Sequence, residues 1–373
     1  MHTVQRVGAR DVIVRPSPVA MVWNEVGRPH EALAVPGVRL SPGEALVEVE
    51  LATICGSDVR TVHGGRPAPV PLVLGHEGVG RVIAVGEGTR CIDGIPLGLG
   101  DRVVWSVTVS CGTCDRCERG VPQRCRTVSR YGHERVHRGW ELSGGFATHV
   151  QLRDGTAIVR APEDVPSRVL APAACATATA VAALEVASAR VALEGALVLV
   201  TGGGLVGLTV AAMAVEAGAE VIVSDPDAAR RELARRFGAQ PVDPAARMVS
   251  LDGRGEVLAA VETSGAPSAI RTVLDTLGVG GVAVLVGGVL PASEVCLDAE
   301  SLGRRLVTVT AVHDSTGEQL RRAVAYLARS WRTLPFDELV GSTHSLADLD
   351  AAFAEAATGT HVRVGVAPGR RSA

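Results

Sequence analysis

The spacing of apolar residues along the chain changes near residue 170. Before that position, short alternating runs such as EALVEVELATI (44–54) and GVGRVIAVGEG (78–88) are interrupted by Pro and Gly, which is typical of strands and turns in an irregular β domain. After it, continuous apolar runs alternate with helical stretches such as DAARRELARRFGA (227–239). The apolar runs are ALVLVTGG, EVIVSD, VAVLVGGV and LVTVTAV. This alternation predicts an α/β fold with a doubly wound parallel sheet in the second half of the chain.

Further elements follow from the same patterns. An Ala-rich stretch at 171–190 is predicted to be helical, and the chain closes with a helix over LADLDAAFAEAATG (346–359) and a strand over HVRVGVAP (361–368). The polar tail GRRSA (369–373) is expected to be disordered.

Charge and length narrow the class of protein. The 373 residues can bury a core without disulfides, and 37 basic against 40 acidic residues favour neither nucleic acid nor an anionic membrane as a partner. Arg6, Arg10, Asp11 and Arg15 interrupt the stretch where a signal peptide would be apolar, and no run of about 18 apolar residues follows. We therefore expect a cytoplasmic protein with a small-molecule ligand.

The basic residues are all arginine. Without lysine, the chain has no lysine side chain to form a Schiff base or act as a base, and it lacks the Tyr/Lys pair of short-chain dehydrogenases.

Four cysteines, Cys111, Cys114, Cys117 and Cys125, fall within fifteen positions. Four thiolates on so short a loop can converge tetrahedrally on Zn²⁺ and leave no open coordination position, so the predicted site is structural. An iron–sulfur cluster remains compatible with the spacing alone, whereas disulfides would need an oxidising compartment.

A second set of metal-binding residue types is dispersed along the chain: Cys55, His76 with the adjacent Glu77, and Cys175. Two sulfurs and an imidazole form the three-ligand set of a catalytic zinc, whose fourth position is left for water or substrate. Taken singly, each residue is also compatible with a buried position without metal.

A glycine-rich turn lies between an apolar run and a helical stretch, in VLVTGGGLVGL (198–208). In such a GxGxxG motif, here Gly202, Gly204 and Gly207, the glycines permit the turn, the approach of a pyrophosphate and close helix–strand packing. The phosphates would meet the helix N-terminus at Leu205 and Val206. Asp225 ends the next strand, where an acid can bind the adenosine ribose, and its charge favours NAD(H) over NADP(H). Arg230 and Arg231 are the nearby cations.

The order of these motifs resembles that of the zinc-dependent medium-chain alcohol dehydrogenases over nearly the whole chain. It runs CGSD (55–58), GHE (75–77), GDRVV (100–104), the four cysteines, CATAT (175–179), then GxGxxG and its acid. The resemblance implies a GroES-like β-rich catalytic domain over 1–176, with a structural zinc lobe at about 108–128. It further implies a Rossmann NAD-binding domain over 177–318 and a C-terminal return to the catalytic domain over 319–373.

The resemblance also implies roles for single residues. Cys55, His76 and Cys175 correspond to the catalytic zinc ligands, and Glu77 to an acid that can approach the metal. The remaining correspondences are Asp58 as the carboxylate that orients the histidine, Ser57 as the hydroxyl that passes the substrate proton, Thr179 as the residue behind the nicotinamide, and Arg363 as a late pyrophosphate contact.

One position departs from the family pattern. Where many members have a proton-relay histidine, this chain has Arg60, which cannot release a proton near neutral pH. His63 or water would then complete the relay, or Arg60 would bind an anionic part of the substrate. Three segments, RTVHGGRPAPVPLVLGHEGVG (60–80), YGHERVHRGWELSGGFATH (131–149) and GTAIVRAP (155–162), are similar to those of a subgroup associated with phosphonate metabolism. Arg60, Arg66, Arg130 and Arg138 are candidate donors to a phosphonate or phosphate, although each is equally compatible with a surface position.

These observations predict a zinc-dependent, NAD(H)-linked alcohol dehydrogenase or carbonyl reductase with two zinc ions per chain. Its substrate would be a small polar alcohol, aldehyde or ketone, with a phosphonate or phosphate as one option, and the family resemblance suggests a homodimer or homotetramer. The alternatives are a reductase of polyol or cyclitol ketones or of an activated C=C bond, or a non-catalytic, zinc-stabilised nucleotide-binding protein. The retained ligand types argue against the last two.

Overall fold

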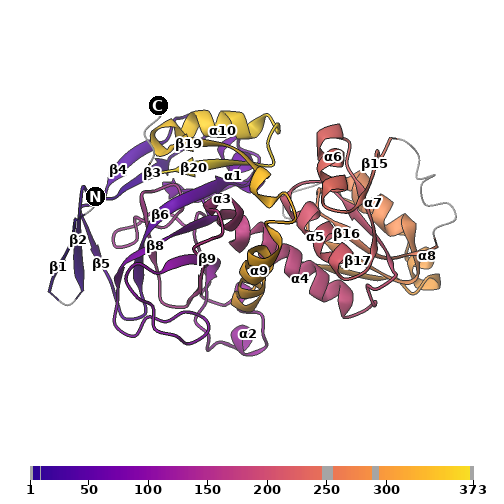
Figure 1. The fold of residues 1–373 in the computed structure, drawn as a ribbon, viewed down its shortest axis with the longest axis horizontal. Coiled ribbons are helices and arrows are strands. Elements are labelled where there is room, and N and C mark those ends of the chain that lie inside the picture. The colour runs from indigo at the N-terminus through magenta and orange to yellow at the C-terminus, as the bar shows by residue number, and fades with distance from the viewer. Residues whose placement is uncertain (1–2, 9, 246–254, 288–293, 370–373) are drawn as a thin grey trace. The chain divides into compact units, whose positions relative to one another are not determined.

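The computed structural model describes residues 3–8, 10–245, 255–287 and 294–369 (Figure 1). They form two compact units. Unit 1 contains the described residues of Met1–Cys175, Asp314–Arg332 and Phe336–Ala373, and unit 2 those of Ala176–His313 and Thr333–Pro335. The domain boundaries predicted above remain proposals, and the predicted disorder at 370–373 lies outside the described residues.

An eight-stranded sheet dominates unit 1, in the order β10-β9-β8-β6-β20-β19, with β11 paired to β6 and β12 to β9. Neighbouring strands are antiparallel except β19 and β20, which are parallel. Smaller sheets have the orders β1-β2-β5 and β4-β3-β7. The strands are β1 (Thr3–Val7), β2 (Asp11–Arg15), β3 (Val19–Trp23), β4 (Glu31–Ala34), β5 (Gly37–Arg39), β6 (Ala45–Ile54), β7 (Leu72–Val73), β8 (Gly78–Val85), β9 (Arg102–Val109), β10 (Ser129–Arg130), β11 (His149–Leu152), β12 (Thr156–Arg160), β19 (Val340–Ser345) and β20 (Arg363–Ala367).

Helices and 3₁₀ turns connect these strands. They are α1 (Gly56–Val62), α2 (Asp115–Glu118), α3 (Ser167–Leu170), α9 (Gly317–Ser330) and α10 (Leu349–Ala357), with 3₁₀ turns η1 (Pro122–Arg124), η2 (Ala171–Ala174), η4 (Phe336–Glu338) and η5 (Leu346–Asp348). Among the described residues, α9 and α10 are the two long helices of this unit, and both come from the C-terminal part of the chain.

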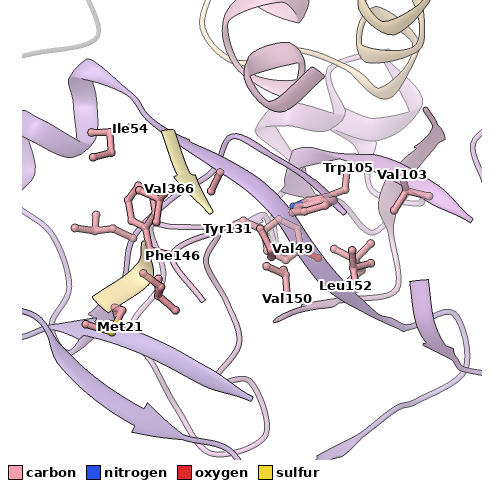
Figure 2. Packing of buried hydrophobic residues seen from close by; sticks show 14 of the residues in the cluster. Met21, Val49, Ile54, Val103, Trp105, Tyr131, Phe146, Val150, Leu152 and Val366 are labelled. Atoms are coloured by element: carbon pink, nitrogen blue, oxygen red, sulfur yellow. The ribbon is translucent and has the colours of Figure 1, made fainter. Parts of the chain in front are cut away.

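The core of unit 1 joins residues from both ends of the sequence. Figure 2 shows Val366 of β20 packed among side chains of the first half of the chain, with Phe146 close to it. Tyr131 is fully buried, and its ring meets the edge of Trp140 at a centroid distance of 5.6 Å. Its hydroxyl contacts Thr156 Oγ1 at 2.7 Å, so the polar tip of this large side chain is satisfied inside the core.

Unit 2 contains the parallel six-stranded sheet that the sequence predicts. Its order, β15-β14-β13-β16-β17-β18, is the 3-2-1-4-5-6 order of dinucleotide-binding folds. The strands are β13 (Leu197–Thr201), β14 (Glu220–Ser224), β15 (Gln240–Val242), β16 (Val257–Glu262), β17 (Leu277–Leu285) and β18 (Thr308–Ala311). The helices are α4 (Ala176–Ser188), α5 (Leu205–Glu216), α6 (Ala228–Arg236), α7 (Pro267–Thr276) and α8 (Ala299–Arg304). Every residue of β13 is buried, which explains why its sequence is continuously apolar rather than alternating.

Within the described residues, no single helix is long and apolar enough to cross a membrane. A bent pair of consecutive helical segments, Ser167–Ala174 and Ala176–Ser188, passes that test by length and composition alone.

Candidate metal and dinucleotide sites

Strand pairing in unit 1 brings three distant segments together. β6 ends at Ile54, directly before Cys55, and pairs with β8, which begins directly after His76 and Glu77. On its other side β6 pairs with β20, where Val364 lies opposite Ile54. Arg363 therefore begins β20 next to the end of β6.

Cys175 reaches the same place from a break in the predicted helix at 171–190. The structure divides that stretch into η2 and α4, and Cys175 lies between them with φ −100° and ψ −72°. The Ala-rich composition gives no sign of this break, because alanine is favourable in any helical turn.

The four side chains Cys55, His76, Glu77 and Cys175 converge, and we call them the Cys55 cluster. Each offers one ligand atom, and these atoms lie within 4.8 Å of one another. The carboxylate of Glu77 is already bound, since Arg363 donates to it at 2.9 and 3.1 Å and Thr53 Oγ1 donates at 2.6 Å. The two sulfurs and the imidazole are therefore the donors left for a metal ion.

Charge in the Cys55 cluster suits a cation. A hydrogen bond from Cys175 and the charge of Arg363 hold the pKa of the Cys55 thiol well below its usual value, against the effect of burial. The same hydrogen bond, together with burial, raises the pKa of Cys175. Burial opposes protonation of His76, but Asp58 and Cys55 outweigh it and raise the pKa of the imidazole. Anionic groups are thus buried around the imidazole of His76. A divalent ion bound to the two sulfurs and the imidazole would compensate this negative charge.

Helix α1 holds the residue behind the imidazole. Asp58 Oδ2 accepts from the backbone N–H of Cys55 at 3.0 Å, which fixes the start of the helix. The other oxygen, Oδ1, lies 3.3 Å from His76 Nδ1, a position from which Asp58 can orient the ring and leave Nε2 for a metal. Ser57 is half-buried on the same helix.

The four-cysteine lobe has the dimensions of a zinc cage. Its Sγ atoms are 3.5 Å apart for Cys114 and Cys117, 3.9 Å for Cys114 and Cys125, and 3.4 Å for Cys125 and Cys111. A tetrahedron with Zn–S bonds of about 2.3 Å has edges of roughly 3.8 Å, so these thiols fit the metal. Hydrogen bonds from the Cys111 backbone and Thr127 lower the pKa of Cys125 to about 7, which favours the ligating thiolate.

Arginines fasten the lobe to the rest of unit 1. Arg124 of η1 donates to Asp314 Oδ2 at 2.8 Å, and Arg130 Nε lies 3.4 Å from the same oxygen. Asp314 adopts φ 61°, a left-handed conformation that Asp tolerates better than most residues. The loop is thereby tied to the segment that leads into α9.

The glycine-rich turn of unit 2 lies at the carboxyl edge of the parallel sheet. Gly202 has φ 97°, and a Cβ built on Gly207 would overlap the Gly202 carbonyl oxygen, so both positions need glycine. The first turn of α5 has no side-chain cap, and a Cβ at Gly204 meets no atom within 4 Å. Leu205 and Val206 therefore present uncapped N–H groups beside open space, which fits a pyrophosphate.

Asp225 lies beside that turn because Thr201 and Ser224 are paired at the ends of β13 and β14. Its carboxylate accepts from the backbone N–H groups of Gly203 at 2.6 Å and Asp227 at 2.8 Å. Arg231 is committed elsewhere, since it donates to the carbonyls of Asp225 and Pro226 and pairs with Asp243 at 3.2 Å.

Five other predicted residues are placed as follows. Thr179 is half-buried on α4 of unit 2, and Arg230 lies on α6 with its Cβ beside Gly203. Arg60 and His63 are exposed at the end of α1, where His63 Nδ1 donates to the Val59 carbonyl at 2.8 Å. The predicted pyrophosphate role of Arg363 remains a prediction, and in this structure its guanidinium binds Glu77.

Two residues at the Cys55 cluster were missed by sequence reasoning. Thr53 donates to Glu77, and His133 packs against His76 with ring centroids 4.8 Å apart. Thr53 lies in a plain strand pattern and His133 in a segment quoted above only for its subgroup resemblance, so neither was assigned to the cluster until the fold brought the segments together.

Two family models match the chain. Residues 41–163 match the alcohol dehydrogenase GroES-like domain, and residues 206–329 match the zinc-binding dehydrogenase family. Geraniol dehydrogenase of Castellaniella defragrans is 32% identical over 349 residues, covering 86% of this chain and 90% of the relative. L-threonine 3-dehydrogenase of Streptomyces avermitilis is 30% identical over 338 residues, covering 87% and 92%.

A solved structure gives the same result. The alcohol dehydrogenase of Thermotoga maritima has a TM-score of 0.87 and 26% identity, over 94% of this chain and 99% of its own. Together with the two cysteine-containing clusters and the glycine-rich turn, these matches place the chain in the zinc-dependent medium-chain alcohol dehydrogenase family, as an NAD(P)-linked oxidoreductase acting on CH–OH groups.

Proposed function

We propose that the protein interconverts a small polar alcohol and the corresponding aldehyde or ketone, with NAD(H) as the coenzyme. The observation that carries this proposal is the Cys55 cluster, in which two sulfurs and one imidazole are left as donors while Glu77 is held by Arg363. A three-donor set leaves a coordination position for substrate, unlike the closed four-cysteine lobe.

Cys55, His76 and Cys175 would hold the catalytic zinc, and Cys111, Cys114, Cys117 and Cys125 the structural one. Zinc bound by the first set supplies a Lewis acid that favours loss of the hydroxyl proton or polarises a carbonyl, and the nicotinamide carries the hydride. Asp58 fixes the orientation of the His76 imidazole. The buried ion pair of Glu77 and Arg363 lies beside the zinc ligands. The protein thus contributes position and electrostatics.

The proton of the substrate hydroxyl passes to Ser57 in this proposal. Arg60 cannot accept this proton from Ser57, because a guanidinium has no lone pair to offer. His63 donates from Nδ1 to Val59, so its exposed Nε2 is the free acceptor of the ring. We therefore propose that water and His63 complete the route to solvent.

Coenzyme binding is assigned to the glycine-rich turn, the first turn of α5 and Asp225. The two oxygens of Asp225 hold the loop and keep lone pairs for the ribose hydroxyls. A 2′-phosphate would be repelled by this carboxylate, and Arg231 is already paired with Asp243. These contacts support NAD(H) as the preferred coenzyme.

Geraniol and L-threonine, after which the two relatives are named, differ widely in polarity, and neither is a phosphonate. The proposed substrates are therefore small polar alcohols and carbonyl compounds, without a phosphonate as a required group. The cytoplasm as location and a homodimer or homotetramer as assembly remain parts of the proposal.

The two metal sites can be tested separately. His76→Ala should abolish turnover in a protein that still folds and binds NADH, whereas Cys114→Ser should lower zinc content and thermal stability and reduce turnover only secondarily. Zinc would be counted by elemental analysis, and NADH oxidation followed with a panel of aldehydes and ketones. Fully active enzyme with a single zinc per chain would refute the two-site assignment.

A further inference from the structure

His133 lies against the imidazole that the proposed function assigns to zinc. The ring centroids of His133 and His76 are 4.8 Å apart, with an interplanar angle of 53°. His133 belongs to the loop after β10, and this loop packs against the segment that precedes β8, since a Cβ on Gly132 would overlap the Gly75 carbonyl.

The hydrogen bonds of His133 define which nitrogen carries its proton. Nδ1 lies 2.9 Å from the Tyr131 carbonyl oxygen, which can only accept, so Nδ1 is the protonated nitrogen. Nε2 then offers a lone pair, and Arg66 Nη1 lies 2.9 Å from it. A guanidinium can only donate, so Nε2 accepts from Arg66 while Nδ1 carries the proton, and the ring is a neutral partner.

The guanidinium of Arg66 is therefore fixed by a neutral partner. Arg66 is half-buried, and within the described parts of the chain no carboxylate pairs with it. Arg130, by contrast, contacts Asp314, and Arg60 and Arg138 are exposed. Of the four arginines singled out from the sequence, Arg66 alone combines an uncompensated charge with a contact to His133, the residue that packs against the proposed metal ligand His76.

We propose that Arg66, positioned by His133, binds an oxyanion group of the substrate, and that the substrate is a small alcohol or carbonyl compound bearing a carboxylate, phosphate or phosphonate. A guanidinium held on one side still presents a fork of N–H donors on the other, and such forks match the oxygens of these groups. This inference rests on the proposed function, because it places the oxidised or reduced carbon of the same molecule at the Cys55 cluster.

The test compares three aldehydes of matched length: butanal, 4-oxobutanoate and 3-oxopropylphosphonate. In wild-type enzyme at least one of the charged aldehydes should have a lower KM than butanal. Arg66→Met keeps the length of the side chain without its charge, and should raise the KM of that aldehyde about ten- to a hundredfold while kcat for butanal changes less than about twofold. Arg66→Lys should retain part of the preference. The matched control, Arg138→Met, should change neither value.

A second readout does not depend on turnover. Zinc-loaded wild-type protein should bind methylphosphonate or acetate in calorimetry, and Arg66→Met should weaken that binding while Arg138→Met does not. If no aldehyde oxidises NADH, the proposed function fails, and calorimetry still decides the role of Arg66. Equal binding of both anions by wild type and Arg66→Met, or an equal change in KM for charged and neutral aldehydes, would overturn the inference. The relative affinity for the two anions distinguishes a carboxylate from a phosphonate ligand.

Discussion

At the scale of single residues, His30 is a buried base whose protonation is unfavourable in the folded chain. Its side chain is 0% exposed, its ring stacks on Phe353 at 5.1 Å, and its Nδ1 lies 2.6 Å from Asp350 Oδ1. Burial lowers the pKa of His30 despite the opposing effect of Asp350 and Asp58. Below the usual histidine pKa of about 6.5, the unfolded chain therefore takes up a proton that the folded chain resists.

We predict that wild-type protein loses stability faster than His30→Gln as the pH falls below 6.5, by up to about 1.4 kcal/mol per pH unit. Glutamine keeps an N–H for Asp350 but does not titrate. The free energy of unfolding would be measured by urea denaturation between pH 7 and 5. Parallel curves for the two proteins would show that His30 is not protonated on unfolding.

Asp225 is expected to determine the choice of coenzyme. Asp225→Ala removes both the ribose acceptor and the charge that repels a 2′-phosphate, so the preference for NADH over NADPH should fall by about tenfold or more. Glu232→Ala, which removes an exposed carboxylate from α6, is the control. The measurement is kcat/KM with each coenzyme. An unchanged ratio in Asp225→Ala, or comparable efficiency with NADPH in the wild type, would contradict this assignment.

At the scale of elements, the junction of β13 and α5 contains glycines with different physical roles. A methyl group at Gly207 would overlap the Gly202 carbonyl oxygen, so Gly207→Ala should cost about 1 to 3 kcal/mol of stability without any coenzyme present. Gly204→Ala meets no neighbouring atom and should leave stability unchanged, yet weaken NADH binding by occupying the space of the pyrophosphate.

Thermal melts without coenzyme and NADH fluorescence titrations separate these effects. If Gly204→Ala bound NADH with wild-type affinity, the pyrophosphate would have to lie elsewhere. An unchanged melting temperature for Gly207→Ala would show that helix and strand can move apart at no cost.

Elements whose burial follows from local pattern could be predicted, and elements defined by distant partners could not. The parallel strands were visible as continuous apolar runs, most clearly β13, which is buried at every residue, and the parallel sheet is confirmed. The break before α4 was not, because local composition is uniform across Cys175. The four zinc-cage cysteines lie close in sequence, whereas Arg363 meets Glu77 across 286 positions, and no local pattern reports such a contact.

At the scale of the whole molecule, the edge of the six-stranded sheet supports the proposed homo-oligomer. β18 ends the sheet, and among the described residues no strand pairs with its outer side. Val309 on β18 is 39% exposed, and Leu306 beside it is 72% exposed. Exposed apolar side chains along an open strand edge favour pairing with the same edge of a second copy.

Val309→Lys should therefore shift the protein toward monomer in light scattering, because a charge on an edge strand opposes edge-to-edge pairing. Leu99→Lys replaces a side chain that is 69% exposed in unit 1 and serves as the control. If Val309→Lys keeps the wild-type mass, the interface does not use this edge.

The position of β20 bears on how the protein is made. Translation releases Cys55, His76, Glu77 and Cys175 from the ribosome long before Arg363, and β20 is the last strand of the described chain. Until it emerges, β6 lacks a neighbour and the Glu77 carboxylate lacks its guanidinium, so burial of that charge is costly. A nascent chain that has not yet released β20 therefore cannot close unit 1 around its metal donors, and emergence of β20 becomes the step that seals them.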